Sequence, residues 1–178
     1  LSLFKDELKK PEFNEMIRLK VAANEGDINS ILFYGIHLFY GDGIEMNKKE
    51  APKYFKIAAD KGNRNAMYNY FLMLKNAIDI PVNDEEAFRY VKMASDLNNP
   101  FAYFHCGEFY EKGIGTEKNY EECKKYFLKS IENGNIKANY HYGYFLLKTN
   151  KESQDEALSY LKIAADNNCI EIILFLLS

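Results

Sequence analysis

The sequence has 178 residues, 15% of them aromatic, and a formal net charge of −3, so it lacks the basic excess that favours nucleic acid as a partner. Its longest apolar run, Ile170 to Leu177, is interrupted by Glu171 and is far shorter than the roughly 18 apolar residues of a membrane span. These observations disfavour a nucleic-acid-binding protein and a transmembrane protein.

One stretch of the chain, Gly26 to Lys61, returns three more times along the sequence. A tyrosine marks the same place in each copy: Tyr54, Tyr90 and Tyr126 at intervals of 36 residues, and Tyr160 after a two-residue deletion. A fixed period of this length is typical of solenoids, whose repeats bury their apolar faces against one another. We therefore predict a single repeat domain over residues 1–178. It comprises the second half of a preceding repeat at 1–25, full repeats at 26–61, 62–97, 98–133 and 134–167, and the first helix of a further repeat at 168–178.

Each full repeat is predicted to form two helices. The first helix carries a small residue and, five positions later, a glycine in three of the four repeats: Ser30, Ala66, Ala102 and Ala138, then Gly35, Gly107 and Gly143, with Phe71 as the exception. Glycine inside a helix costs up to about 1 kcal/mol relative to alanine, so this recurrence predicts close approach of a neighbouring helix. The Gly-x-Gly sequences at 41–43 and 113–115 follow a helix rather than a strand, which favours helix-ending turns over phosphate binding.

The second helix of each repeat is predicted to begin at a capping residue that precedes a glutamate by three positions. The pairs are Asn47 and Glu50, Asn83 and Glu86, Asn119 and Glu122, and Ser153 and Glu156. Pro52 conflicts with a helix interior, so we expect that helix to start late or to kink there. Glycines and asparagines between the repeats predict tight turns.

These residues resemble the Sel-one-like repeat family, relatives of the tetratricopeptide repeat. The resemblance extends over residues 13–177. The third repeat keeps Ala102, Gly107, Tyr110, Gly113 and Gly115 of the family pattern, and the first repeat keeps Gly35, Gly41, Gly43, Ala51, Tyr54, Phe55 and the run Ala58 to Asp60. It implies an all-α, right-handed superhelix of antiparallel helix pairs. It also implies that the first helices line a concave face used for protein or peptide binding, and it supplies no catalytic residues.

The repeat register predicts where a ligand contacts the first helices. The packing positions leave one stripe of each first helix unused. The candidate binding residues on it are Phe33, Ile36, Tyr40, Asn69, Leu72, Phe101, His105, Glu108, Lys112, Lys137, His141, Tyr144 and Lys148, and Asn29, Asn65 and Asn76 complete the stripe. It is apolar at its start and basic at its end, which suits a segment with apolar anchors followed by acidic residues. In the alternative interpretation, Phe33, Ile36 and Tyr40 pack under the amino-terminal helix and the lysines are merely solvated.

Histidine and cysteine give no catalytic or metal-binding set. His105 and His141 occupy the same position in adjacent repeats, so we expect them to be neighbours, but a zinc site needs three or four ligands. His37 falls on a packing position and is predicted to be a core residue. Cys106, Cys123 and Cys169 are expected to be buried, reduced thiols. We expect no cofactor and no metal.

We predict a protein–protein interaction scaffold that binds a peptide or protein segment on its concave face without catalysis. Two alternatives remain open: the regulatory or docking region of a larger enzyme such as a protein kinase, and a structural component of a large assembly. No secretory signal is visible, so we expect a cytoplasmic location. The chain lacks an initiator Met and ends in the apolar segment Cys169 to Leu177, which suggests a fragment whose last helix is covered by further repeats or by a partner.

Overall fold

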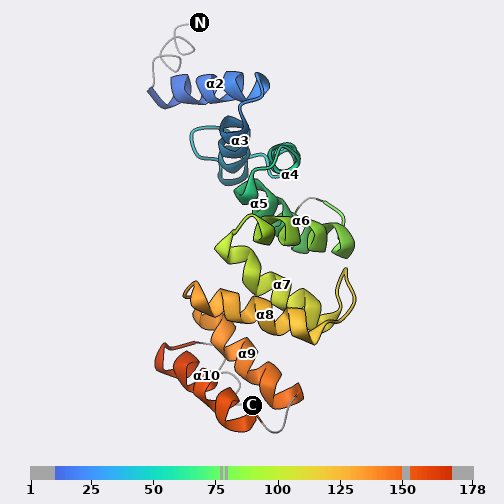
Figure 1. Ribbon diagram of the computed structural model, residues 1–178. Helices are drawn as coiled ribbons and strands as arrows, with labels where there is room; N and C mark the ends of the chain where they lie inside the picture. Colours follow the sequence, from blue (N-terminus) through green and yellow to red (C-terminus); the bar gives the residue numbers. More distant parts are fainter. Residues whose placement is uncertain (1–10, 77, 79, 150–152, 170–178) are drawn as a thin grey trace, which may run out of the picture. The chain divides into compact units, whose positions relative to one another are not determined.

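The computed structural model describes residues 11–76, 78, 80–149 and 153–169, and the regular elements in these ranges are α-helices (Figure 1). They are α2 (Pro11–Asn24), α3 (Ile28–Tyr40), α4 (Ala51–Asp60), α5 (Arg64–Lys75), α6 (Asp84–Asp96), α7 (Pro100–Lys112), α8 (Tyr120–Glu132), α9 (Ile136–Thr149) and α10 (Gln154–Asp166). The all-α prediction is confirmed for this part of the chain. The predictions for residues 1–10 and for the helix from Ile170 onward lie outside the described residues.

The chain divides into two compact units, Leu1–Asn99 and Pro100–Ser178, which we call the N-terminal unit and the C-terminal unit. In the N-terminal unit, each helix from α2 to α6 packs against the next helix along the chain. The helices from α7 to α10 do the same in the C-terminal unit. Neighbours in sequence are therefore neighbours in space, as expected of a repeat protein, while the predicted repeat boundaries stay predictions.

The turns between repeats use left-handed backbone. Gly62 has φ +94°, and Asn98 and Gly134 occupy the same place in the next two turns with φ +59° and +80°. Glycine adopts this conformation without steric cost, and asparagine is among the few other residues that tolerate it. The predicted tight turns are confirmed.

Two of the four predicted capping residues, Asn83 and Asn119, cap their helices as expected. The side-chain oxygens of Asn83 and Asn119 accept hydrogen bonds from the backbone N–H of Glu86 (3.0 Å) and Glu122 (3.1 Å), and both asparagines are extended, with φ near −142° and −145°. Such backbone places the side chain over the first turn of the helix. Ser153 has ψ 26° instead, and its side chain does not cap α10, so that prediction is wrong.

The helix that contains Pro52 starts late, as predicted. Asn47 accepts a hydrogen bond from the Glu50 N–H at 3.1 Å, but this bond closes a turn that precedes the helix. The α-helix itself begins at Ala51, so Pro52 lies in its first turn. Proline is tolerated there because the first N–H groups of a helix have no partner inside it.

The recurring glycines let the two helices of a repeat approach closely. A Cβ atom added to Gly35, Gly107 or Gly143 would lie 3.0 Å from the Phe55 ring, 2.7 Å from the Phe127 ring and 2.8 Å from Leu161 Cγ, respectively. The second repeat has Phe71 at the glycine position, and Val91 stands where its neighbours carry Phe55 and Phe127. Phe71 and Val91 are both completely buried. A larger residue on the first helix is thus matched by a smaller residue on the second, which preserves the filled volume.

The predicted tyrosine positions form pairs between helices. Tyr34 and Tyr54 meet edge to face, with ring centroids 4.8 Å apart, and so do Tyr70 and Tyr90 at the same distance. Such pairs add roughly 0.5–1.5 kcal/mol beyond the area that they bury. They fix each second helix against its first helix and so position the residues of the stripe.

All three cysteines are buried thiols, as predicted. Burial raises the pKa of Cys123 to about 12, and the negative charge of Glu111 acts in the same direction. None of the helices that the structure describes has both the length and the apolar character of a membrane span.

Candidate functional site

A cavity of about 360 Å³ lies in the N-terminal unit beside the first helices of the first and second repeats, α3 and α5. Its walls come from both first helices, from α4 and from the loop after α5: Ile36, Phe39, Tyr40, Phe55, Asn69, Leu72, Met73, Asn76 and Ile78. The structure thus brings together four candidate residues predicted from the sequence, Ile36, Tyr40, Asn69 and Leu72. A concave, mostly apolar surface with a few polar groups is the usual form of a binding site.

The fifth candidate residue of this unit, Phe33, lies on α3 outside the cavity lining. Its side chain is 51% exposed and that of Tyr40 is 72% exposed. Both rings are therefore largely accessible to a ligand, while the alternative in which they pack under the amino-terminal helix stays an interpretation.

Two asparagines supply the polar part of the cavity. The Asn76 side chain donates a hydrogen bond to the Leu72 carbonyl at 2.9 Å, which satisfies one of its groups. The half-buried Asn69 side chain makes no hydrogen bond with any residue that the structure describes, so its amide can still donate and accept. An asparagine side chain carries the same donor and acceptor pair as a peptide bond. Asn69 is therefore suited to bind the backbone of an extended segment.

The start of the stripe is held by the turns between repeats. The Asn63 side chain donates to the Asn29 side chain at 3.4 Å, and the Asn99 side chain donates to the Asn65 side chain at 3.2 Å. The same contact thus recurs one repeat later. It fixes Asn29 and Asn65 in structural roles beside the candidate residues.

In the C-terminal unit, three candidate residues meet on α7. The Glu108 carboxylate lies 2.9 Å from His105 Nδ1 and 3.3 Å from Lys112 Nζ. The side chains of His105 and Glu108 are only 16% and 12% exposed, whereas Phe101, at the start of the same helix, is 66% exposed. Because Glu108 partly neutralises Lys112, the stripe is less basic here than its sequence suggests.

The two histidines of this unit contact one phenylalanine, Phe104. Its ring centroid lies 5.3 Å from that of His105 and 4.9 Å from that of His141. Phe104 is not among the candidate residues predicted from the sequence. In the part of the chain that the structure describes, no group of three or more His, Cys, Asp or Glu side chains could hold a metal ion.

The remaining candidate residues lie on α9. Tyr144 is 41% exposed and stacks on Tyr140, with ring centroids 6.3 Å apart, and Lys137 and Lys148 are exposed. Burial raises the pKa of the neighbouring Glu111, although the charges of Lys112 and Lys148 oppose that shift.

His37 is not the core residue that its packing position predicts. Its ring nitrogen Nδ1 lies 2.8 Å from the Asp42 carbonyl oxygen, and its side chain is 24% exposed. The Gly41–Gly43 turn folds back over the end of α3, so the ring binds the turn instead of packing into the core.

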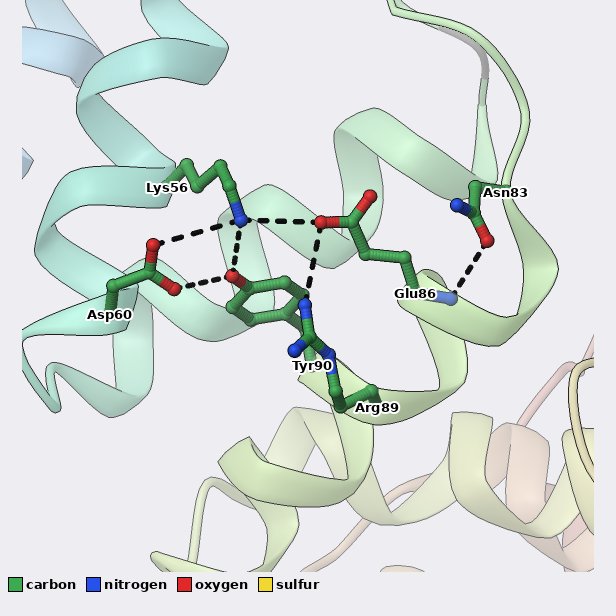
Figure 2. A network of polar contacts seen from close by, with 6 residues as sticks. All are labelled: Lys56, Asp60, Asn83, Glu86, Arg89 and Tyr90. Atoms are coloured by element: carbon green, nitrogen blue, oxygen red, sulfur yellow. Dashed lines mark hydrogen bonds and ion pairs between the residues drawn. The ribbon is translucent and has the colours of Figure 1, made fainter.

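A polar network between α4 and α6 was not predicted from the sequence (Figure 2). Lys56 Nζ lies 2.7 Å from Tyr90 Oη, 3.2 Å from Glu86 Oε1 and 3.6 Å from Asp60 Oδ2. The Tyr90 hydroxyl donates a hydrogen bond to Asp60, and Arg89 lies 3.5 Å from Glu86. Burial opposes the charge on Lys56, but its bonds to Tyr90 and Glu86 raise its pKa above the ordinary value.

A signal for this network is present in the sequence. Lys20 precedes Lys56 by one repeat, and its ammonium nitrogen lies 5.7 Å from the centroid of the Tyr34 ring. Lys56 lies 5.2 Å from the ring centroid of the equivalent tyrosine, Tyr70. The repeated lysine and tyrosine positions could therefore have indicated a contact between repeats.

The comparisons with known proteins agree with the repeat pattern. Four consecutive segments, residues 28–63, 64–99, 100–135 and 136–169, match the sequence model of the Sel1 repeat. No curated protein matches the chain.

Solved structures with similar folds include a Sel1 repeat protein from Oxalobacter formigenes, with 26% identity and a TM-score of 0.83 over 98% of this chain and 69% of that one. Another is the cysteine rich protein B of Helicobacter pylori, with 21% identity and a TM-score of 0.54 over 69% of this chain and 93% of that one. A third is c5321, a protective antigen of uropathogenic Escherichia coli with an SLR fold, with 19% identity and a TM-score of 0.53 over 90% of this chain and 42% of that one. The all-helical elements and this likeness together show the repeat fold.

Proposed function

The chain belongs to the Sel1 repeat family, whose fold generally mediates protein–protein interaction, and we propose that it binds a segment of a partner protein on its first-helix face. By first-helix face we mean the candidate residues of α3 and α5 in the N-terminal unit and, taken separately, those of α7 and α9 in the C-terminal unit. Binding there is by shape and chemical complementarity, without catalysis. Sel1 repeat proteins are typically non-catalytic scaffolds, which supports this proposal.

The observation that carries the proposal is the cavity in the N-terminal unit. It combines an apolar lining, a volume of about 360 Å³ and the available amide of Asn69. A large apolar side chain of the partner fills the cavity, and the partner backbone bonds to Asn69. Well-packed apolar anchors of this kind dominate the binding energy of most protein interfaces.

The C-terminal unit offers a more polar surface to the same kind of ligand. Phe101 and Tyr144 present exposed rings, and Lys137 and Lys148 present charges. In this proposal they bind a polar or acidic segment of a partner protein on the C-terminal unit by itself. Charges at the rim of an interface contribute more to specificity and association rate than to affinity.

The proposal is tested by capture of partner proteins from the source cells with the chain and two leucine variants. Leu72→Lys introduces a charge into the cavity, and Leu158→Lys makes the same change at a 57% exposed position of α10. We expect the Leu158→Lys variant to retain the partner and the Leu72→Lys variant to lose it. A partner held equally by all three proteins would move the contact away from the first-helix face.

A variant with no expected effect on folding makes this test independent of stability. Tyr40→Ala removes a side chain that lines the cavity and is 72% exposed. We expect it to weaken binding of the captured partner while the thermal unfolding curve stays unchanged. The double variant Tyr144→Ala/Lys148→Ala tests the C-terminal unit in the same way.

A further inference from the structure

A second hollow, of about 430 Å³, lies on another face of α4 in the N-terminal unit and shares no lining residue with the cavity described above. Three lysines, four largely apolar residues and one carboxylate line it: Lys49, Pro52, Lys53, Lys56, Ile57, Asp60, Tyr70 and Ile80. We call it the basic hollow. The carboxylate, Asp60, is paired with Lys56 and accepts a hydrogen bond from Tyr90. The basic hollow combines positive charge with an apolar floor. None of the first-helix residues proposed to bind a partner lines it.

The three lysines of the basic hollow differ in whether other residues of the protein bind their ammonium groups. Lys56 is bound by Asp60, Glu86 and Tyr90, so its charge is already compensated (Figure 2). Lys49 and Lys53 are exposed, and their side chains make no hydrogen bond or ion pair with the residues that the structure describes. These two ammonium groups are therefore available to a ligand.

Comparison with the other repeats shows that this availability is particular to the first repeat. The residue equivalent to Lys53 is Arg89 in the second repeat and Lys125 in the third, and each pairs with the capping glutamate of its own helix, at 3.5 Å and 2.9 Å. The residues equivalent to Lys49 are acidic, Glu85 and Glu121.

In the first repeat, the equivalent glutamate, Glu50, is bonded to Asn47 instead of to Lys53. The Asn47 side chain donates a hydrogen bond to the Glu50 carboxylate at 3.3 Å. This contact belongs to the turn that precedes α4, and α4 begins late because of Pro52. The displaced start of the helix thus explains why Lys53 does not form the pair seen in the next repeat.

The surroundings of the two lysines restrict the ligand. The chain as a whole carries a formal charge of −3, so an acidic ligand gains no attraction from the protein's net charge. At physiological ionic strength, exposed charges act over about 8–10 Å, so the ligand must bring its negative group close to Lys49 and Lys53. The apolar floor formed by Ile57 and Ile80 favours an aliphatic side chain next to that group.

We propose that the basic hollow binds an acidic segment of a partner protein, with a carboxylate at Lys49 and Lys53 and an adjacent aliphatic side chain on Ile57 and Ile80. This site is separate from the first-helix face and gives the chain a second contact surface. Two sites on one scaffold can hold two partners, or two parts of one partner, at the same time.

The test is a binding titration with a fluorescent peptide that contains two Asp-Glu-Leu sequences, compared with the same peptide carrying Asn-Gln-Leu. We expect the acidic peptide to bind, the amide peptide not to bind, and affinity to fall with added salt. The double reversal Lys49→Glu/Lys53→Glu should weaken binding by about tenfold or more, since it replaces two attractions with two repulsions. Lys49→Ala/Lys53→Ala should give a smaller loss.

One control variant decides whether the effect is local. Lys124→Glu/Lys162→Glu makes the same change in net charge at two exposed lysines of α8 and α10 and should leave binding unchanged. Equal loss in this control, or no loss in the Lys49/Lys53 variant, would overturn the proposal.

The first-helix face is tested with the same peptide. Loss of binding with Leu72→Lys or with Lys137→Glu/Lys148→Glu, and none with Lys49→Glu/Lys53→Glu, would assign the acidic peptide to that face and refute the basic hollow. Displacement of the bound peptide by inorganic phosphate as effectively as by the unlabelled peptide would show a general anion site and would equally overturn the proposal. Neither result refutes the proposal that a partner binds the first-helix face, so the two proposals fail separately.

Discussion

Gly107 and Phe127 approach so closely that a Cβ atom on residue 107 would lie 2.7 Å from the phenylalanine ring. Both residues are buried, and Phe127 is completely inaccessible to solvent. Alanine gains up to about 1 kcal/mol of helix propensity over glycine, whereas overpacking costs about 1 to 3 kcal/mol. Gly107→Ala should therefore reduce the free energy of unfolding by about 1 to 2 kcal/mol, measured by urea denaturation.

The matched control for this change is a double-mutant cycle. Phe127→Val leaves space beside residue 107, so Gly107→Ala should cost less in that background than in the natural chain. Contacting residues typically show coupling of about 0.5–3 kcal/mol in such cycles. Additive effects of the two changes would show that the alanine methyl does not meet the ring.

Two buried tyrosines should respond oppositely to loss of their hydroxyl groups. The Tyr90 hydroxyl bonds to Lys56 and Asp60, whereas the buried Tyr142 hydroxyl has no hydrogen-bond partner among the described residues. Tyr90→Phe should destabilise the protein by about 1 to 3 kcal/mol because charged partners lose a bond, and Tyr142→Phe should be neutral or stabilising. Thermal unfolding of both variants measures this difference. Similar melting temperatures for the two would contradict the assigned hydrogen bonds.

Replacement of Glu111 by glutamine should raise the stability of the protein, and the gain should depend on pH. Burial raises its pKa above the ordinary value of 4.5, so the folded state holds the proton more tightly than the unfolded chain. The stability that the Glu111 carboxyl contributes is fully present below pH 4.5 and is lost as the pH rises through the raised pKa of the folded state. Glu111→Gln should therefore be more stable than the natural chain at pH 7 and equally stable well below pH 4.5.

The comparison is made by urea denaturation across this range of pH. Glu132→Gln, at an exposed position at the end of α8, serves as the control. A gain for Glu111→Gln that persists unchanged to the lowest pH would show that ionisation of Glu111 is not its cause.

The buried thiols should resist alkylation in the folded protein. Cys106 and Cys123 are both completely buried, and with a pKa of about 12 Cys123 carries almost no reactive thiolate at neutral pH. Iodoacetamide should therefore leave both residues unmodified in native buffer and should label them in urea, as measured by mass spectrometry of peptides. Rapid labelling in native buffer would contradict their burial.

Features that depend on local chemistry could be predicted from the sequence. The capping asparagines, the late start at Pro52 and the left-handed turn at Asn98 each follow from the residue itself and its close neighbours. The prediction for Ser153 was wrong because a capping residue needs extended backbone to bond, and Ser153 has ψ 26° instead.

Features that depend on contacts between helices were only partly predictable. The stripe identified Ile36, Tyr40, Asn69 and Leu72, because their spacing places them on one face of each first helix. It missed Phe55 from α4 and Ile78 from the loop after α5, which line the same cavity, because spacing within one helix contains no information about its neighbours. The same reason explains why the contacts of Lys56 with α6 were missed.

The pairing of Phe71 with Val91, beside the glycine and phenylalanine pairs of the adjacent repeats, has a consequence for recombination between repeats. A crossover that brings the first helix of the second repeat together with the second helix of the first would place Phe71 against Phe55 and exceed the available volume. The reciprocal product would combine Gly35 with Val91 and leave a void. Exchange of whole helix pairs keeps each matched pair of side chains together, whereas exchange of single helices separates them, so the helix pair is the unit that preserves this packing when such a chain is lengthened or rearranged.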